Sequence, residues 1–322
     1  MKKNIVTIGG GTGTFVVLSG LKSIPEAALS AVVSSLDDGG STGRLRDAYG
    51  FLPHGDARQA LVALADERAA LTRALFAYRF AKGDIAGHNF GNLFLTALTD
   101  ILGSDALAIE EASKILRVKG SVIPVSEHAG TLIARLESGE TLVGEHVIDT
   151  RTPGRSPIVA LETKEPSKVC EDAKQAIEEA DIIILGPGDL YASTLANFAI
   201  GGVTDAVASS PGRLVYIVNL FTKAGETDGY SAKKHVEEVA RYAGRKPDTI
   251  LIHQGSFAEE VLDRYAAEKE FPVIDDLGEG AHILRRHFAD VVISEKLPGD
   301  AVSRSLIRHD SAKIAEAIQA LI

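Results

Sequence analysis

Residues 9–13 are the first in the chain whose types and spacing point to ligand chemistry, because four of the five are glycines. They follow a short apolar run at residues 5–8 and precede a helical pattern at 14–21, for which Thr12 or Thr14 is a candidate N-cap. At such a junction, free backbone N–H groups and the positive end of the helix attract phosphate. We therefore predict that a phosphate-type ligand binds to Gly10, Gly11, Thr12 and Gly13. The alternative is a loop that needs glycine only for its turns.

This segment matches neither of two common nucleotide-binding motifs. No Gly-Lys-Ser/Thr sequence follows it, which excludes a P-loop. Thr14 stands where a dinucleotide-binding fingerprint has its third glycine, which disfavours an NAD-dependent oxidoreductase.

Two adjacent carboxylates, Asp37 and Asp38, follow a second apolar run at residues 29–36. They begin a segment rich in glycine, predicted to be a loop, that closes with two arginines. Adjacent carboxylates repel a polyphosphate unless a divalent cation bridges them or one acts as a base. Asp37 and Asp38 are therefore candidate catalytic residues and candidate ligands of Mg²⁺, and the segment's candidate phosphate ligands are Ser41, Thr42, Arg44 and Arg46. A solvated turn capped by Asp37 is the alternative.

Further candidates follow other predicted strands. Ligands of open α/β sheets collect at the carboxyl ends of the strands. The strands predicted at residues 181–185, 214–220 and 305–307 lead directly to the candidate binding residues Gly186, Gly188, Asn219 and Arg308. We expect the strand at 305–307 to be parallel to the others, which would bring Arg308 to the same edge; a surface arginine is the alternative.

Two motifs lie in a helical region. Asp56 is a natural N-cap for the helix that begins near residue 56, and Arg58 in its first turn opposes the helix dipole, so an anionic partner nearby would explain it. His88 and Asn92 are four residues apart and would share a helix face. By themselves, a capping histidine and a core asparagine are the more ordinary interpretation.

The elements that position these residues form an α/β pattern. Strands are predicted at residues 5–8, 29–36, 181–185, 214–220, 249–253, 272–274 and 291–293, with helices at 167–179, 232–242 and 258–268. Residues 56–116 are helical in pattern, and short strands follow at 122–125, 131–136, 141–148 and 158–162, with a hairpin turn at 137–140. We predict a Rossmann-like three-layer α/β fold, a mostly parallel sheet with some short antiparallel strands. Residues 1–322 would form one domain with a helical insert at about 53–118.

Composition limits the class of protein. The net charge of −10 argues against nucleic acid as a partner, and no apolar run approaches the roughly 20 residues that span a membrane. The single cysteine, Cys170, cannot form an internal disulfide, which fits a reducing compartment. We expect a cytoplasmic protein that binds a nucleotide-type ligand; we also expect a homo-oligomer, although no residue pattern fixes the oligomeric state.

Six motifs in the same order make the chain resemble the CofD-like family over nearly its whole length. They are the segments at residues 9–13, 37–46, 55–58, 88–93, 186–193 and 225–229. The family includes 2-phospho-L-lactate transferase and the bacterial gluconeogenesis-factor (YvcK-like) proteins. The resemblance implies a ligand at the glycine loops of a Rossmann-like sheet, and it implies site roles for His88, Asn92 and Asn219.

Within this family the chain is more similar to the bacterial branch. Residues 186–191 read Gly-Pro-Gly-Asp-Leu-Tyr, where that branch has Gly-Pro-Gly-Ser-Leu-Tyr, so Asp189 replaces a serine. The transferase branch tends toward Gly-Pro-Ser-Asn-Pro. The resemblance thus implies a gluconeogenesis-factor-like protein that binds a nucleotide sugar of the UDP-N-acetylglucosamine type and links carbon supply to cell-wall synthesis and cell shape. The alternative is an enzyme that transfers a phospholactyl group from a nucleotide-activated donor to a deazaflavin acceptor, so turnover stays an open question.

Overall fold

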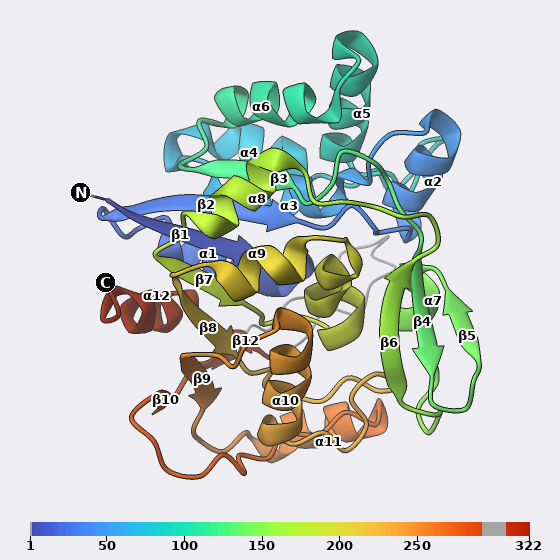
Figure 1. Ribbon diagram of the computed structural model, residues 1–322. Coiled ribbons are helices and arrows are strands. Elements are labelled where there is room, and N and C mark those ends of the chain that lie inside the picture. Colours follow the sequence, from blue (N-terminus) through green and yellow to red (C-terminus); the bar gives the residue numbers. More distant parts are fainter. Residues whose placement is uncertain (1, 292–306) are drawn as a thin grey trace.

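A seven-stranded sheet forms the centre of the computed structural model, which describes residues 2–291 and 307–322 (Figure 1). Its strands are β1 (Lys3–Ile8), β2 (Ala27–Val33), β3 (Ser121–Pro124), β7 (Ile182–Leu185), β8 (Arg213–Ile217), β9 (Thr249–His253) and β10 (Ile283–Arg286). They lie in the order β10-β9-β8-β7-β1-β2-β3, and all neighbours are parallel. The chain builds outward in both directions from β1, and open α/β sheets bind ligands at such a switch point.

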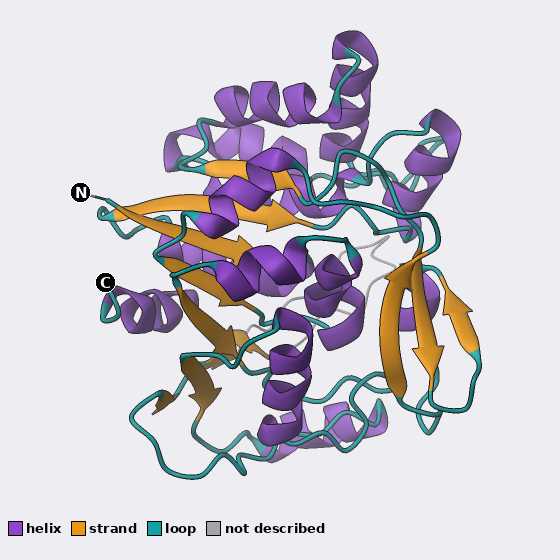
Figure 2. Ribbon diagram, viewed as in Figure 1, coloured by secondary structure: helices purple, strands orange, loops and turns teal. Residues whose placement is uncertain are grey.

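Helices cover both faces of the sheet (Figure 2), which confirms the predicted three-layer α/β class. On one face lie α1 (Gly11–Leu21), α3 (His54–Leu64) and α12 (Ser311–Gln319). On the other lie α8 (Glu171–Glu178), α9 (Val203–Ser209) and α10 (Ala232–Ala243).

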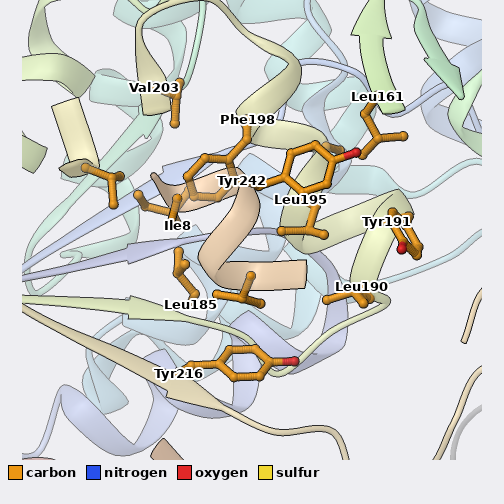
Figure 3. Packing of buried hydrophobic residues seen from close by; sticks show 14 of the residues in the cluster. Ile8, Leu161, Leu185, Leu190, Tyr191, Leu195, Phe198, Val203, Tyr216 and Tyr242 are labelled. Atoms are coloured by element: carbon orange, nitrogen blue, oxygen red, sulfur yellow. The ribbon is translucent and has the colours of Figure 1, made fainter. Parts of the chain in front are cut away.

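Alternation along the strands supplies a core to each layer. Ile5 and Ile184 face the layer of α1, whereas Ile8 and Leu185 face the layer of α10. Figure 3 shows this second core, where Ile8 and Leu185 lie beneath aromatic and aliphatic side chains from the covering helices. Because both faces are buried, the strands read as nearly continuous apolar runs.

The connection from β2 to β3 is helical, as predicted. It contains α2 (Gly40–Tyr49), α3, α4 (Ala70–Ala77), α5 (Phe90–Leu102) and α6 (Asp105–Leu116), with a short helical turn at Glu67–Ala69. The loop predicted at residues 37–46 is wrong, because α2 begins at Gly40. Ser41, Thr42 and Gly43 are buried, so tertiary packing overrides their poor helix propensity.

Helix starts also differ from the predictions. Gly10 is the N-cap of α1 and has no side chain, so neither Thr12 nor Thr14 is the N-cap. Pro53, not Asp56, is the N-cap of α3. The N-cap of α5 is Asn89, which leaves His88 outside the helix, so His88 and Asn92 do not share a helix face.

A three-stranded antiparallel sheet lies on the side toward which β1 and β2 point (Figure 1). It consists of β4 (Leu132–Leu136), β5 (Thr141–Val143) and β6 (Ile158–Thr163), and the predicted turn at 137–140 joins β4 to β5. The strand predicted at 141–148 is wrong after Val143. Gly144, with φ of +103°, ends β5, and the short helix α7 (Glu145–Asp149) follows.

The last part of the chain departs most from the predicted sheet. β11 (Ala289–Val291) and β12 (Ile307–His309) form a separate antiparallel pair, so the strand predicted near 305–307 is not a parallel member of the main sheet. Positions 292–293 and 305–306 of these predictions lie outside the described residues. The strand predicted at 272–274 is wrong, because only Pro272 makes a bridge, to Phe221, and proline lacks the N–H that a ladder needs. Between β9 and β10 lies α11 (Glu259–Ala267).

Candidate ligand cavity

A cavity of about 850 Å³ opens at the carboxyl edge of the sheet, beside the switch point at β1. Its walls come from the β1–α1 junction, from the segments after β2, β7 and β8, and from α7, α11 and β12. Half of the predicted site residues line it: Gly10, Gly11, Thr12, Gly13, Asp37, Gly188, Asn219 and Arg308. Parallel strands bring all of these residues except Arg308 together, because their carboxyl ends meet at one edge; Arg308 comes from β12 of the separate antiparallel pair.

The two glycine loops touch each other in the cavity wall. A Cβ added to Gly13 would lie 1.9 Å from the carbonyl oxygen of Pro187, so only glycine permits this approach. Asn219 holds the second loop, since its Nδ2 donates to the carbonyl of Gly188 at 2.8 Å. Gly11 has φ of +68°, the left-handed region that glycine adopts most easily. The start of α1 therefore lines the cavity beside a loop that Asn219 holds in place.

A carboxylate of the chain lies against the first glycine loop. The N–H of Gly11 donates to Asp56 Oδ1 at 2.8 Å, and a Cβ on Gly10 would overlap the same carboxyl group. The pKa of Asp56 is raised to about 7, first by burial and then by the nearby Asp37, against the Gly11 N–H and Arg58, which lower it. Asp56 thus lies in the candidate site, whereas the sequence had indicated only a helix cap.

Acidic side chains of α7 form another wall. Glu145 and Asp149 are four residues apart and both line the cavity. Burial, followed by the charge of Asp37, raises the pKa of Glu145 to about 10. Lys223 Nζ lies 3.4 Å from Asp149 Oδ1 and 4.0 Å from Asp189 Oδ2. Burial would lower the pKa of Lys223, but these two carboxylates raise it above its ordinary value, so this lysine stays charged.

Asp37 and Asp38 point to different partners. Asp37 lines the cavity, and its Oδ1 accepts the N–H of Gly39 at 2.8 Å. Burial raises the pKa of Asp37. Asp38 Oδ1 instead accepts the N–H of His146 at 2.8 Å, in the first turn of α7. Of these two aspartates, therefore, Asp37 lines the cavity and Asp38 does not.

Four other predicted site residues form a polar network next to Asp37 rather than in the cavity wall. Ser41 Oγ lies 3.1 Å from His88 Nδ1, and Asn92 Nδ2 donates to Thr42 Oγ1 at 3.3 Å. Asn92 Oδ1 also accepts from Arg58 Nε at 2.9 Å, so Arg58 has an uncharged partner. Gly55 lies between Thr42 and Asp37, since a Cβ there would be 2.7 Å from Thr42 Oγ1 and 2.6 Å from Asp37 Oδ2.

The remaining predicted residues lie farther from the cavity lining. Arg46 contacts its neighbour Asp47 at 3.3 Å, and Arg44 lies near Gly87. Gly186, with φ of +71°, packs against Tyr216 and the carbonyl of Ile217. These residues shape the surroundings of the cavity but are not in its wall.

An apolar wall completes the cavity. Phe221 and Tyr265 stack with ring centroids 4.0 Å apart, and Leu220 and Ile307 pack with them. Arg308, next to Ile307 in β12, brings a guanidinium to this side. The cavity thus combines backbone N–H groups, carboxylates and an aromatic surface.

Sequence reasoning did not select several of these residues. They are Asp56, Glu145, Asp149, Asp189, Phe221, Lys223 and Tyr265. The signals in the sequence that could have identified them are the strand ends that precede Asp189 and Lys223 and the four-residue spacing of the α7 carboxylates.

Within residues 2–291 and 307–322 no three His, Cys, Asp or Glu side chains are arranged to hold a metal ion. None of the helices in the same residues is long and apolar enough to cross a membrane.

Comparison with known proteins places this fold and cavity in a family. Residues 5–294 match the family described as 2-phospho-L-lactate transferase CofD, and the chain belongs to that family. Among its relatives is the gluconeogenesis factor of Halalkalibacterium halodurans, 38% identical over 325 residues that cover 98% of this chain and 96% of the relative. The gluconeogenesis factor of Bacillus subtilis is 37% identical over 327 residues, covering 100% of this chain and 98% of the relative.

A solved structure of similar fold is the crystal structure of a member of the UPF0052 family from Bacillus halodurans. It superposes with a TM-score of 0.88 at 37% sequence identity and covers 98% of this chain and 99% of that one. The Rossmann-like α/β architecture described above is therefore shared with this family.

Proposed function

We propose that the protein is a gluconeogenesis factor that binds a nucleotide sugar of the UDP-N-acetylglucosamine type and links carbon metabolism to cell-wall synthesis and cell shape. The observation that carries the binding proposal is the pair of touching glycine loops, at Gly13 and Pro187, which line one cavity together. Backbone N–H groups at a helix start are suited to a diphosphate. The names of the relatives supply the link to carbon metabolism.

The size and composition of the cavity support a ligand of this kind. Ligand pockets in proteins commonly have volumes of about 300–1,000 Å³, and this cavity has about 850 Å³. The stacked pair Phe221 and Tyr265 offers an apolar surface to a base. The carboxylates Glu145 and Asp149 offer acceptors to sugar hydroxyl groups.

A divalent cation would relieve the repulsion between these carboxylates and a diphosphate. Mg²⁺ usually binds one or two carboxylates together with substrate phosphates and waters. Asp37 fits that role, because it lines the cavity and a ligand would supply the remaining oxygens. Asp38 fits less well, since it accepts the N–H of His146.

The second candidate function is phospholactyl transfer to a deazaflavin acceptor. The family description that matches the chain is consistent with it. Asp37 in the cavity would then be placed to act as the base toward an acceptor hydroxyl.

A ligand panel separates these functions. Melting temperature is measured with UDP-N-acetylglucosamine, GDP, NAD and a free sugar phosphate, each with Mg²⁺. A ligand at about 100 times its dissociation constant stabilises the native state by about 2.7 kcal/mol. We expect the largest shift with the UDP-sugar. A larger shift with GDP would favour the transferase, and no shift with the UDP-sugar would refute the proposal.

A further inference from the structure

The glycine loop already holds a carboxyl group that belongs to the chain. Asp56 Oδ1 accepts the N–H of Gly11 at 2.8 Å, from the first turn of α3, 45 residues away in sequence. The absent side chain of Gly10 makes room for this carboxyl group, because a Cβ there would lie 1.9 Å from Asp56 Oδ2. The close approach that glycine would give a phosphate is thus used by a carboxylate.

We infer that Asp56 is a specificity-determining residue that competes with the ligand's phosphate for the Gly11 N–H, so that binding a diphosphate requires the carboxylate to be displaced or neutralised. The inference rests on the proposed binding of a phosphate-bearing ligand at this loop. The first N–H groups of α1 precede its first internal hydrogen bond, so Thr12 and Gly13 also present theirs at the helix start. A diphosphate that reached them would lie beside Asp56.

The charges around Asp56 strengthen this competition. Asp37, after β2, raises the electrostatic cost of a negative charge at Asp56, whereas Glu145, on α7, has a pKa of about 10 and is uncharged at pH 8. Arg58, on α3, is the nearby cation, and its Nε donates to Asn92. A free polyphosphate at the loop therefore meets the carboxyl groups of Asp56 and Asp37, and a ligand whose charge is offset by a cation or proton is preferred.

Three variants distinguish a competitor from a structural clamp. Asp56→Asn keeps an acceptor for the Gly11 N–H but removes the charge, and Asp56→Ala removes both. Asp100→Asn removes an exposed carboxylate on α5 and is the matched control. Affinities for UDP-N-acetylglucosamine and for inorganic pyrophosphate are measured by calorimetry at pH 8, and circular dichroism verifies the fold of each ligand-free variant.

We expect both Asp56 variants to bind pyrophosphate and the UDP-sugar roughly tenfold more tightly than the wild type, the effect of removing a charge-assisted hydrogen bond from the competing group. Asp100→Asn should bind like the wild type. A clamp would give the opposite order, with Asp56→Ala the weakest binder.

The outcomes separate this inference from the proposed function. If the UDP-sugar binds and Asp56→Asn leaves both affinities unchanged or weaker, the inference is overturned and the proposed function stands. If the UDP-sugar binds to no variant while pyrophosphate binds more tightly to Asp56→Asn, the proposed function fails and the inference stands. If no variant binds either ligand, both are overturned.

Discussion

Replacing Asp56 by asparagine should change how stability depends on pH, even without ligand. The pKa of this carboxyl is raised from 3.8 to about 7, with burial as the first cause. The native state therefore holds a proton that the unfolded chain releases, and stability is lost as the pH rises through 7. At pH 6 this difference stabilises the native state by about 1.4 kcal/mol, and at pH 8 by almost nothing.

Urea denaturation of the wild type, Asp56→Asn and Asp100→Asn at pH 6, 7 and 8 measures this difference. Other raised carboxyl groups, such as Glu226 with a pKa of about 8, also make the wild type less stable at higher pH. Asparagine does not titrate in this pH range. The free energy of unfolding of Asp56→Asn, minus that of the wild type, should therefore increase by about 1.4 kcal/mol from pH 6 to pH 8. The free energy of unfolding of Asp100→Asn should change with pH in the same way as that of the wild type. Parallel curves for Asp56→Asn as well would refute the assignment of a buried, protonated carboxyl at the glycine loop.

Three other substitutions test the cavity. Gly13→Ala would place a Cβ 1.9 Å from a backbone oxygen, so urea denaturation should show a loss of about 1–3 kcal/mol, whereas Gly278→Ala, with open space around it, should show none. Arg308→Ala should weaken calorimetric affinity for the UDP-sugar at least tenfold, because a guanidinium can clamp a diphosphate with two charge-assisted hydrogen bonds of about 1.5–3 kcal/mol each. Asp37→Asn and removal of Mg²⁺ by EDTA should lower that affinity in the same proportion, and Asp38→Asn should lower it less.

Each of these expectations has a contrary result. If Gly13→Ala were as stable as Gly278→Ala, the two glycine loops could separate at little energetic cost. Unchanged affinity in a well-folded Arg308→Ala protein would remove Arg308 from the site. Damage from Asp37→Asn with no effect of EDTA would make Asp37 a direct base or hydroxyl acceptor instead of a cation ligand.

The sequence predicts the sheet edge well because its signals are local. An apolar run that ends in glycine, aspartate or asparagine identifies a strand and the residues at its carboxyl end, and the parallel arrangement then brings Gly11, Asp37, Gly188 and Asn219 together. This grouping follows from the strand ends alone and requires no knowledge of contacts between residues far apart in the sequence.

The other walls depend on contacts that no local pattern specifies. α7 has only five residues, and its Val147 and Ile148 read as the end of a strand, which concealed the spacing of Glu145 and Asp149. Asp56 has the composition of a helix cap, but its partner Gly11 is 45 residues away.

The packing of α1 against α12 has a consequence for biosynthesis. A Cβ on Gly20 would lie 2.0 Å from the carbonyl of Ser311, so the first helix of the chain is in close contact with the last. At about 5–20 residues per second, a ribosome needs roughly 15–60 s to add the residues between these two positions. During that interval the side of α1 that α12 will cover, around Gly20, has no native partner from α12. The nascent chain is therefore a natural client for a chaperone until its final helix emerges, and chains that stop before β12 would lack both that cover and the Arg308 wall of the cavity.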